Sequence, residues 1–314
     1  SIQSGGNYNV AVGDEAGTNL TTGDSNTLIG YLAGEDIVGG GNNVAIGYET
    51  MKNEDGHGKN TAVGTQALFA QNAGADAYNT AVGFQAGAST TTGIYNTFIG
   101  GLAGDALTDA DNNVAVGRAA LSTDTLGSCS VAIGRNALVT QNFSSATDSF
   151  NVAVGDRAGA AVTTGTNNTL IGGLSGDAIT TGAQNTAVGQ GALSANTTAS
   201  SNTAVGYQAL YDNTTGTQTV AVGTSALANN TTANNNVAVG MQTAFSTTTG
   251  GNNIAMGKQA LYYNTTGTSN VAIGHVAMHL NTTADNNTSV GYQSLYANTT
   301  GAQNTAVGRN ALDA

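Results

Sequence analysis

The stretch Asn202–Gly223, NTAVGYQALYDNTTGTQTVAVG, decides the fold because it contains nearly the same phrase twice. The phrase TAVG that begins at Thr203 returns as VAVG that begins at Val220. Throughout the chain the phrase keeps Val, Thr or Ile in its first place, Val, Ile or Met in its third place and Gly in its last. A repeat at a fixed period predicts one small unit stacked on copies of itself. The 18 copies begin at positions 10, 27, 44, 61, 80, 97, 114, 131, 152, 169, 186, 203, 220, 237, 254, 271, 288 and 305.

The spacing of the copies is nearly constant, with a period of 17. Only two intervals are longer, the one from position 61 to position 80 and the one from position 131 to position 152. No separate domain interrupts the series, so we predict that residues 1–314 form a single continuous repeat array. Neither end carries the polar cap that solenoids need. We therefore expect the array to be a segment of a longer chain, or to stack end to end with other subunits.

The composition favours a thin, elongated object. The chain has 45 Gly, no Pro, no Trp and only 8% charged residues, and its hydrophobic 39% is mostly Ala and Val. Small side chains cannot fill a wide core at native density. The net charge of −12, with seven Lys and Arg, argues against nucleic acid as a partner, because such binding needs a basic surface. The sequence has no apolar run long enough to span a bilayer, so we expect no membrane insertion.

Each repeat predicts short strands. The first and third places of the phrase are mostly β-branched and alternate with a small or apolar residue, which is a strand pattern. We expect a strand at the phrase, a corner at its Gly, a second short strand around QALY and a turn through NTTG. Two short strands are not stable alone. Stacking them at about 4.8 Å per coil provides partners, and 18 coils would then make a rod of roughly 85 Å.

Equal spacing places like residues above like residues in this stack. We expect Val to stack on Val inside the coil, and Asn on Asn at the corner, where the side-chain amides form ladders. The two longer intervals need only bulge one turn outward, near Gln71–Ala77 and near Gln141–Phe150. The predicted fold class is therefore all-β, a parallel β-solenoid of about 18 coils with a 17-residue period.

Both faces of the predicted strands carry apolar residues, although a two-layer coil has only one inner face per strand. The remaining set would run along the rod as a long exposed apolar stripe, which soluble monomers avoid. Self-association along the rod axis would cover that stripe. The first partner that we expect is therefore the chain itself.

The phrases NVAIGYET, NTAVGYQAL and SVAIGRNAL resemble the head repeats of YadA-like trimeric autotransporter adhesins. The longer form NTAVG…AL…NTTG is similar to repeats of phage tail-fibre and bacterial surface proteins. The resemblance covers residues 9–312 and implies a left-handed β-roll with three chains to a head, and hence a homotrimeric rod. The autotransporter repeat is shorter, and the membrane anchor, coiled-coil stalk and chaperone domain that accompany such repeats are not seen in this sequence.

Tyrosines gather in the last third of the chain and are candidate contacts to a receptor or glycan. An exposed Tyr offers a flat apolar face with a polar tip. The alternative is that these rings only cover strand edges. The pairs Tyr207/Tyr211 and Tyr292/Tyr296 stand at equivalent places five coils apart. The six candidates are Tyr207, Tyr211, Tyr262, Tyr263, Tyr292 and Tyr296.

The triplet NTT, which recurs in the turns, matches the acceptor pattern for N-glycosylation. The repeat itself explains the recurrence. If the source is bacterial or viral, a turn with stacked amides is the interpretation that we favour. The Asn residues concerned are Asn196, Asn213, Asn230, Asn264, Asn281 and Asn298.

No residue pattern points to catalysis, to a cofactor or to a metal. Acids gather within positions 14–36, but general acid–base chemistry needs two carboxylates that converge in a cleft. His275 and His279 stand four apart in the sequence, a spacing that does not turn both side chains to one side of a strand and turn. In a trimer, one axial His from each chain would supply three metal ligands.

These observations lead us to expect a structural and adhesive extracellular fibre, the shaft of a phage tail fibre or of a surface adhesin. It would attach to a cell-surface glycan or protein. The alternative is a self-assembling extracellular matrix filament without a specific receptor. A third alternative is an enzyme or an ice-binding surface, but ice binding would need a flat array of Thr on a strand face, and most of the threonines fall in the expected turns.

Overall fold

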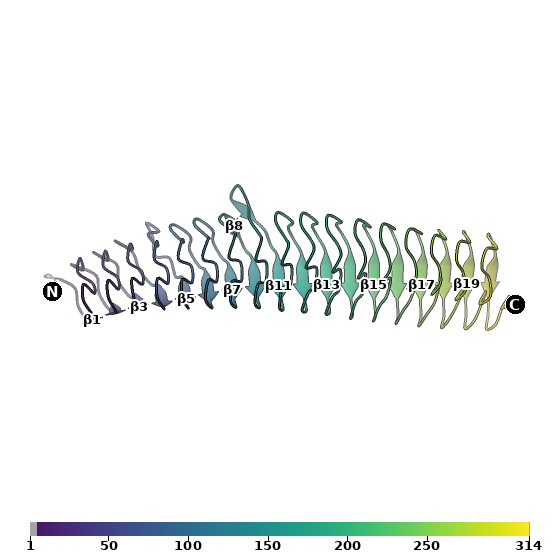
Figure 1. The fold of residues 1–314 in the computed structure, drawn as a ribbon, viewed down its shortest axis with the longest axis horizontal. Helices are drawn as coiled ribbons and strands as arrows, with labels where there is room; N and C mark the ends of the chain where they lie inside the picture. The colour runs from purple at the N-terminus through teal and green to yellow at the C-terminus, as the bar shows by residue number, and fades with distance from the viewer. Residues whose placement is uncertain (1–4, 314) are drawn as a thin grey trace. The chain divides into compact units, whose positions relative to one another are not determined.

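The computed structural model describes residues 5–313, and the chain divides into two compact units, Ser1–Arg157 and Ala158–Ala314. In each unit, nine repeat strands lie parallel and side by side in chain order (Figure 1). Among the described residues there is no helix. The chain is therefore an all-β parallel β-solenoid of about 18 coils, and its coils follow the 17-residue period of the sequence, as predicted.

The strands are short, and most contain three residues. Those of the first unit are β1 (Val10–Val12), β2 (Thr27–Ile29), β3 (Val44–Ile46), β4 (Thr61–Val63), β5 (Thr80–Val82), β6 (Thr97–Ile99), β7 (Val114–Val116), β8 (Gly127–Ser128), β9 (Val131–Ile133), β10 (Thr147–Asp148) and β11 (Val152–Val154). Those of the second unit are β12 (Thr169–Ile171), β13 (Thr186–Val188), β14 (Thr203–Val205), β15 (Val220–Val222), β16 (Val237–Val239), β17 (Ile254–Met256), β18 (Val271–Ile273), β19 (Thr288–Val290) and β20 (Thr305–Val307).

The register between neighbouring strands keeps like residues opposite one another. In β14 and β15, Thr203 pairs with Val220 and Ala204 with Ala221. The same register links β1–β7, β9 and β11 in the first unit. It also links β12–β20 in the second unit. The 18 repeat strands begin at the 18 predicted positions, so the predicted strand at each phrase is confirmed.

The Gly that follows each strand is required by backbone geometry. Gly206 has a φ of +136°, which side chains resist, and an added Cβ would lie 2.6 Å from the carbonyl oxygen of Gly223. Gly223 stands in the same relation to Gly240, at 2.5 Å. Because this close approach repeats from coil to coil, only Gly lets the corners stack at the spacing of the strands.

The second strand expected around QALY is not formed, and the structure has turns there instead. Ala209 N donates to Gly206 O at 3.3 Å, and Asn213 N donates to Leu210 O at 3.3 Å. Gln208 and Leu210 adopt φ values of +53° and +51°. This segment still bonds to both neighbouring coils, since Gln208 N donates to the coil before, and Leu210 N to the coil after, each at 3.0 Å. The inter-coil hydrogen bonds that a strand would make are thus kept by turns.

In every repeat strand after β1, the middle residue is buried inside the coil. Ala204 is fully buried, whereas Thr203 and Val205 on either side of it are half-buried. The expectation that Val stacks on Val inside is therefore wrong. The interior also holds Ala209 and Leu210, both fully buried, and this leaves room for little more than Ala at the middle place. The first and third strand residues form what we call the outer sheet face.

Where the middle residue is large, Gly replaces Leu in the same coil. Leu28 stands in the middle of β2, and a Cβ added at Gly34 would lie 2.8 Å from its Cδ2. Leu170 stands in the middle of β12, and a Cβ at Gly176 would lie 2.7 Å from its Cδ2. A large middle residue therefore fills the space that Leu occupies in other coils, and Leu28 also reaches the Gly17 of the coil before it.

The predicted Asn ladder is confirmed. The backbone N–H of Asn43 donates to Oδ1 of Asn26 at 3.0 Å, and Nδ2 of Asn26 donates to Gly40 O at 2.9 Å. The same arrangement recurs in the second unit, where Asn270 N donates to Oδ1 of Asn253 at 2.9 Å. All four Asn side chains are buried. Each amide therefore closes its own corner and holds the next coil, and its buried polar atoms have partners.

The Asn of several NTT triplets forms a second ladder inside the coil. Asn230 Nδ2 donates to Oδ1 of Asn213 at 2.7 Å, and Asn281 Nδ2 donates to Oδ1 of Asn264 at 2.8 Å. All four side chains are fully buried. This confirms the interpretation as a turn with stacked amides, because a glycan cannot be attached to a nitrogen that lies inside the folded coil.

The two longer intervals bulge as expected, and the second one also adds structure. In the first, Gln71 stays buried and its Nε2 donates to Thr91 O at 3.2 Å, while most of the residues that follow it are at least partly exposed. In the second, β10 pairs with β8 in a separate two-stranded parallel sheet. Figure 1 shows a loop beside β8 standing out from the row of coils of the first unit.

Candidate attachment surface

The six tyrosines predicted from the sequence all lie in the second unit, in three columns that follow the strand. Tyr207 and Tyr292 stand directly after the corner Gly, and both are exposed. The other four lie further along their coils. Of these, Tyr211 and Tyr263 are 38% and 46% exposed, and Tyr262 and Tyr296 are half-buried. The candidates therefore do not form one surface.

Four consecutive coils carry a continuous aromatic stack. Phe245 and Tyr262 stack with ring centroids 5.3 Å apart and planes 10° apart. His279 continues the stack, with centroids 5.3 Å from Tyr262 and 5.3 Å from Tyr296. The structure thus joins Tyr262 and Tyr296 through His279 and extends the stack with Phe245, and both added residues were missed. The sequence carried a signal for both, because positions 245, 262, 279 and 296 follow one another at the period of the repeat.

Tyr263 stands perpendicular to this stack. Its plane makes an angle of 77° with Tyr262 and 81° with His279, at centroid distances of 4.7 Å and 5.3 Å. Both faces of Tyr262 and of His279 are already covered by their neighbours in the stack. Their edges must therefore meet a face of Tyr263. This leaves the opposite face of the Tyr263 ring open.

An open pocket of about 500 Å³ lies beside Tyr263. Its lining includes a column of threonines whose hydroxyls are already used as donors. Thr265 Oγ1 donates to Thr282 O at 3.0 Å, and Thr282 Oγ1 donates to Thr299 O at 3.1 Å. These two hydroxyl oxygens retain lone pairs that can accept hydrogen bonds. The pocket is lined by Ser246, Tyr263, Thr265, Leu280, Thr282 and Thr299.

The remaining tyrosines are not part of this pocket. The Tyr292 ring lies between Arg309, at 5.5 Å from its centroid, and His275, at 5.6 Å. Tyr211 shares the column of the stack but stands two coils before Phe245, and its ring lies over Gly191. His275 and His279 belong to different columns, in agreement with the expectation that they do not face one side.

The acids near the start of the chain engage separate partners. Glu35 pairs with Lys52 at 3.5 Å, and Asp36 accepts a hydrogen bond from Asn19 at 3.0 Å. Asp24 accepts a hydrogen bond from the backbone N–H at position 7, at 2.6 Å. These contacts are ordinary surface contacts between neighbouring coils.

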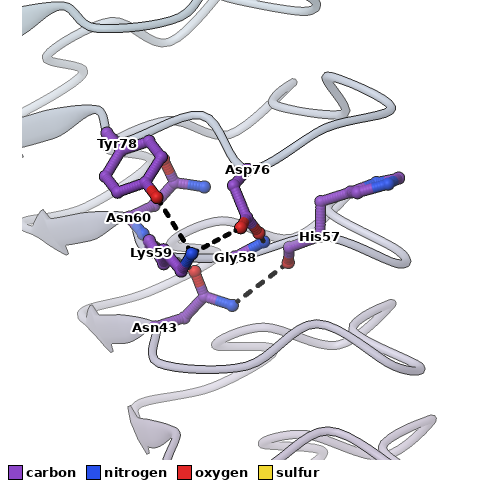
Figure 2. Close-up of polar contacts among 7 residues, drawn as sticks. All are labelled: Asn43, His57, Gly58, Lys59, Asn60, Asp76 and Tyr78. Carbon is purple, nitrogen blue, oxygen red and sulfur yellow. Dashed lines mark hydrogen bonds and ion pairs between the residues drawn. The ribbon is translucent and has the colours of Figure 1, made fainter.

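A polar cluster fastens the first insertion to the coil before it. Figure 2 shows Lys59 turned toward Asp76 and Tyr78, at 2.7 Å and 2.9 Å from its Nζ, while the His57 ring points away. The hydrogen bonds to Asp76 and then to Tyr78 raise the pKa of Lys59 above its ordinary value, and the bond from Lys59 lowers the pKa of Asp76. Tyr78 also stacks on Tyr95, with centroids 5.6 Å apart.

The sequence predicted no metal site, but one group of side chains could hold an ion. Glu54, Asp55 and His57 each place a ligand atom within 4.8 Å of the others, and in residues 5–313 this is the one such group of three or more His, Cys, Asp or Glu. Glu54 is fully buried, and burial raises the pKa of its carboxyl to about 7. The signal that was missed is local, since EDGH at positions 54–57 stands where other coils have TTTG or NTTG.

A search with models of known protein families finds no match to this chain, and no curated protein matches it. Its similarity to autotransporter and tail-fibre repeats therefore stays a resemblance of sequence phrases. In the part of the chain that the structure describes, no helix is long and apolar enough to cross a membrane. Three features of the structure could bind another molecule or an ion: the outer sheet face, the pocket beside Tyr263, and the group of Glu54, Asp55 and His57.

Proposed function

We propose that the chain is a structural and adhesive element of an extracellular fibre. In this proposal, copies of the chain associate along their outer sheet faces, and the Tyr263 pocket contacts a cell-surface glycan. The proposal that the assembly is a trimer with left-handed coils rests on the resemblance to autotransporter head repeats. Placement outside the cell, on a cell surface or virion, rests on the same resemblance.

The observation that carries the proposal is the outer sheet face. It presents β-branched and other apolar side chains on every coil, and some of them are well exposed, including Ile254 at 40%, Met256 at 41% and Ile273 at 36%. Nine three-residue strands spaced by about 4.8 Å make a face of roughly 400 Å² in each unit. An apolar patch of this size is about the largest that a typical monomer exposes, and such patches are often functional. The face of each unit is about half of the roughly 800 Å² per partner that a stable interface buries.

A second copy of the chain is the occupant that fits this face best. The face is narrow and uncharged, and the same kinds of side chain recur on it once per coil. Only a partner with the same rise per coil can therefore contact the face in register over many coils. Another copy has that rise by construction. The Thr residues in the first strand places can form hydrogen bonds across such an interface without leaving a buried charge.

The test is the mass of the purified chain in solution. We expect an assembly of about 93 kDa, three times the 31.0 kDa of one chain. Val222→Lys with Val239→Lys places two charges on the outer sheet face and should yield the 31.0 kDa monomer. Thr215→Lys with Thr232→Lys places the same charges on exposed turns and should leave the assembly intact. If both variants keep the wild-type mass, the outer sheet face is not the interface.

The Tyr263 pocket favours receptor contact over a filament without a receptor. A pyranose ring has an apolar face of C–H groups that stacks on an aromatic ring, and hydroxyls at its rim that donate to nearby acceptors. The open face of Tyr263 and the acceptor oxygens of Thr265 and Thr282 supply both. All the lining residues are uncharged, so the chemistry suits a neutral sugar.

Binding of the intact assembly to immobilised neutral glycans tests this part of the proposal. Tyr263→Ala should lower binding at least tenfold, whereas Tyr263→Phe, which keeps the ring face, should retain most of it. Tyr211→Ala is the matched control, because Tyr211 is also exposed but lies outside the pocket. End-to-end polymerisation without binding to any glycan or cell would favour the matrix filament instead.

A further inference from the structure

Glu54 occupies an interior column in which most of the other residues are apolar or hydrogen-bonded, and no other residue but Asp124 is an acid. The column is the seventh residue after each corner Gly, and in the two coils before Glu54 it holds Leu20 and Ile37, both fully buried. In the next coil it holds Gln71, whose side-chain oxygen accepts from Asn79 at 2.8 Å. A carboxylate in this column therefore needs donors or a counter-charge, because an unpaired buried charge is costly.

Asp124, the other acid in this column, shows what a satisfied carboxylate looks like there. It is fully buried and accepts from Gln141 Nε2 at 2.7 Å, from Gly127 N at 3.0 Å and from Phe143 N at 3.2 Å. Its surroundings therefore supply short bonds to both of its oxygens. The contrast with Glu54 does not depend on burial, since both side chains are completely enclosed.

Among the residues that the structure describes, Glu54 has two hydrogen bonds, and both are long. His57 N donates to its Oε1 at 3.3 Å, and Asn60 Nδ2 donates to its Oε2 at 3.5 Å. The nearby lysines are engaged elsewhere, Lys52 with Glu35 and Lys59 with Asp76. No cation of the first unit therefore compensates the Glu54 carboxylate, as far as residues 5–157 are described.

His57 supplies an independent observation in the same turn. Its Nδ1 is shielded from solvent and has no hydrogen-bond partner within the described part of the chain, although a buried ring nitrogen normally has one. The exposed carboxylate of Asp55 completes the group, and the three ligand atoms lie within 4.8 Å of one another. A Cβ added at Gly56 would meet no atom within 4 Å, so the turn is open to solvent at this point.

We propose that Glu54, Asp55 and His57 bind one divalent transition-metal ion, with Zn²⁺ the best match. Two carboxylates neutralise the charge of the ion, and an imidazole nitrogen favours Zn²⁺ over Ca²⁺ or Mg²⁺, which prefer oxygen ligands. Water from the open side would complete a four-coordinate site. The ion would fix the EDGH turn, a structural role that does not depend on the proposed attachment function.

Titration of ZnCl2 into the metal-stripped full chain, followed by calorimetry, tests the proposal. We expect one ion per chain with a Kd below about 10 µM. Glu54→Gln and His57→Asn should each weaken binding at least tenfold. Gln already occupies this interior column at Gln71, one coil later, so the coil should tolerate Glu54→Gln. His275→Asn is the matched control and should bind as tightly as the wild type.

Histidine NMR locates the ion, because the chain has only three histidines. Zn²⁺ should shift the ring signals of His57 and leave those of His275 and His279 in place. The proposal is overturned if the wild type binds no Zn²⁺, if either substitution at 54 or 57 leaves the affinity unchanged, or if the other histidines shift instead. Equal affinity for Ca²⁺ or Mg²⁺ without a response from His57 would also overturn it.

Discussion

Replacing Phe98 with Ala should destabilise the coils around β6, and Leu at position 104 should restore part of the loss. The Phe98 ring is fully buried and lies next to Gly87 and Gly104. A Cβ added at Gly87 would lie 2.5 Å from Cδ2 of Phe98, and a Cβ added at Gly104 would also collide with the ring. Truncating a buried Phe to Ala costs about 3–5 kcal/mol. Elsewhere Leu68 and Leu121 occupy the place of Gly104 with φ values of +49° and +53°, close to its +57°, so Leu suits this backbone.

Gly104→Leu alone should also destabilise the first unit, by about 1–3 kcal/mol, because Leu would meet the Phe98 ring. In the double variant the added Leu fills the space that the ring leaves. The double variant should therefore be about 2–3 kcal/mol more stable than the two separate losses predict. Hydrogen exchange of peptides that cover β5–β7 measures the local opening free energy of all four chains. If the losses simply add, the two side chains do not share one volume and this account of the core is wrong.

Two further predictions concern buried polar groups. The first prediction concerns the metal-free chain, studied in EDTA. Burial raises the pKa of the Glu54 carboxyl from 4.5 to about 7, so between these pH values the folded chain keeps a proton that the unfolded chain has lost. The free energy of unfolding of the first unit should therefore fall as pH rises from about 4.5 to about 7. This loss of stability should reach at most about 3 kcal/mol, and the Glu54→Gln variant should not show it. A wild-type melting temperature that does not change across this pH range would contradict the prediction. Asn270→Ala removes the acceptor of Asn287 N, at 3.0 Å, and the donor to Ala284 O, at 2.8 Å. It should cost about 2–4 kcal/mol and speed exchange of the Asn287 amide, whereas an unchanged exchange rate would mean that the ladder does not hold neighbouring coils.

The positions of the strands and corners could be predicted from the sequence because each copy carries its own signal. Alternating β-branched residues mark β14, and Gly206 marks the corner that follows it. The Asn ladder could also be predicted, since identical amides at a constant period must lie above one another once the strands pair in register. These features depend on local pattern and spacing alone.

Which strand face points inward could not be predicted, because both faces are apolar. The answer depends on how much of the interior the turn residues Ala209 and Leu210 fill, and this leaves room only for Ala204. The turns at Gln208 and Leu210 were missed because these residue types usually avoid positive φ. Here hydrogen bonds to the coils on both sides hold them in that conformation.

The candidate site was predicted in part. Tyr263 was named from its chemistry, but its open face follows from the edges of Tyr262 and His279, which no sequence pattern reveals. Phe245 and His279 could have been found by extending the period of the repeat. The group at Glu54 and His57 was missed because its residues are close together in the sequence and match no common metal-binding spacing.

The central claim is that other copies of the chain cover the outer sheet face. The mass of the native assembly, measured by light scattering at physiological ionic strength, tests this most directly. We predict about 93 kDa, or a multiple of it if trimers join end to end, and a shift to 31.0 kDa when Val222 and Val239 are both replaced with Lys. A wild-type chain that remains at 31.0 kDa over a wide range of concentrations would contradict the claim.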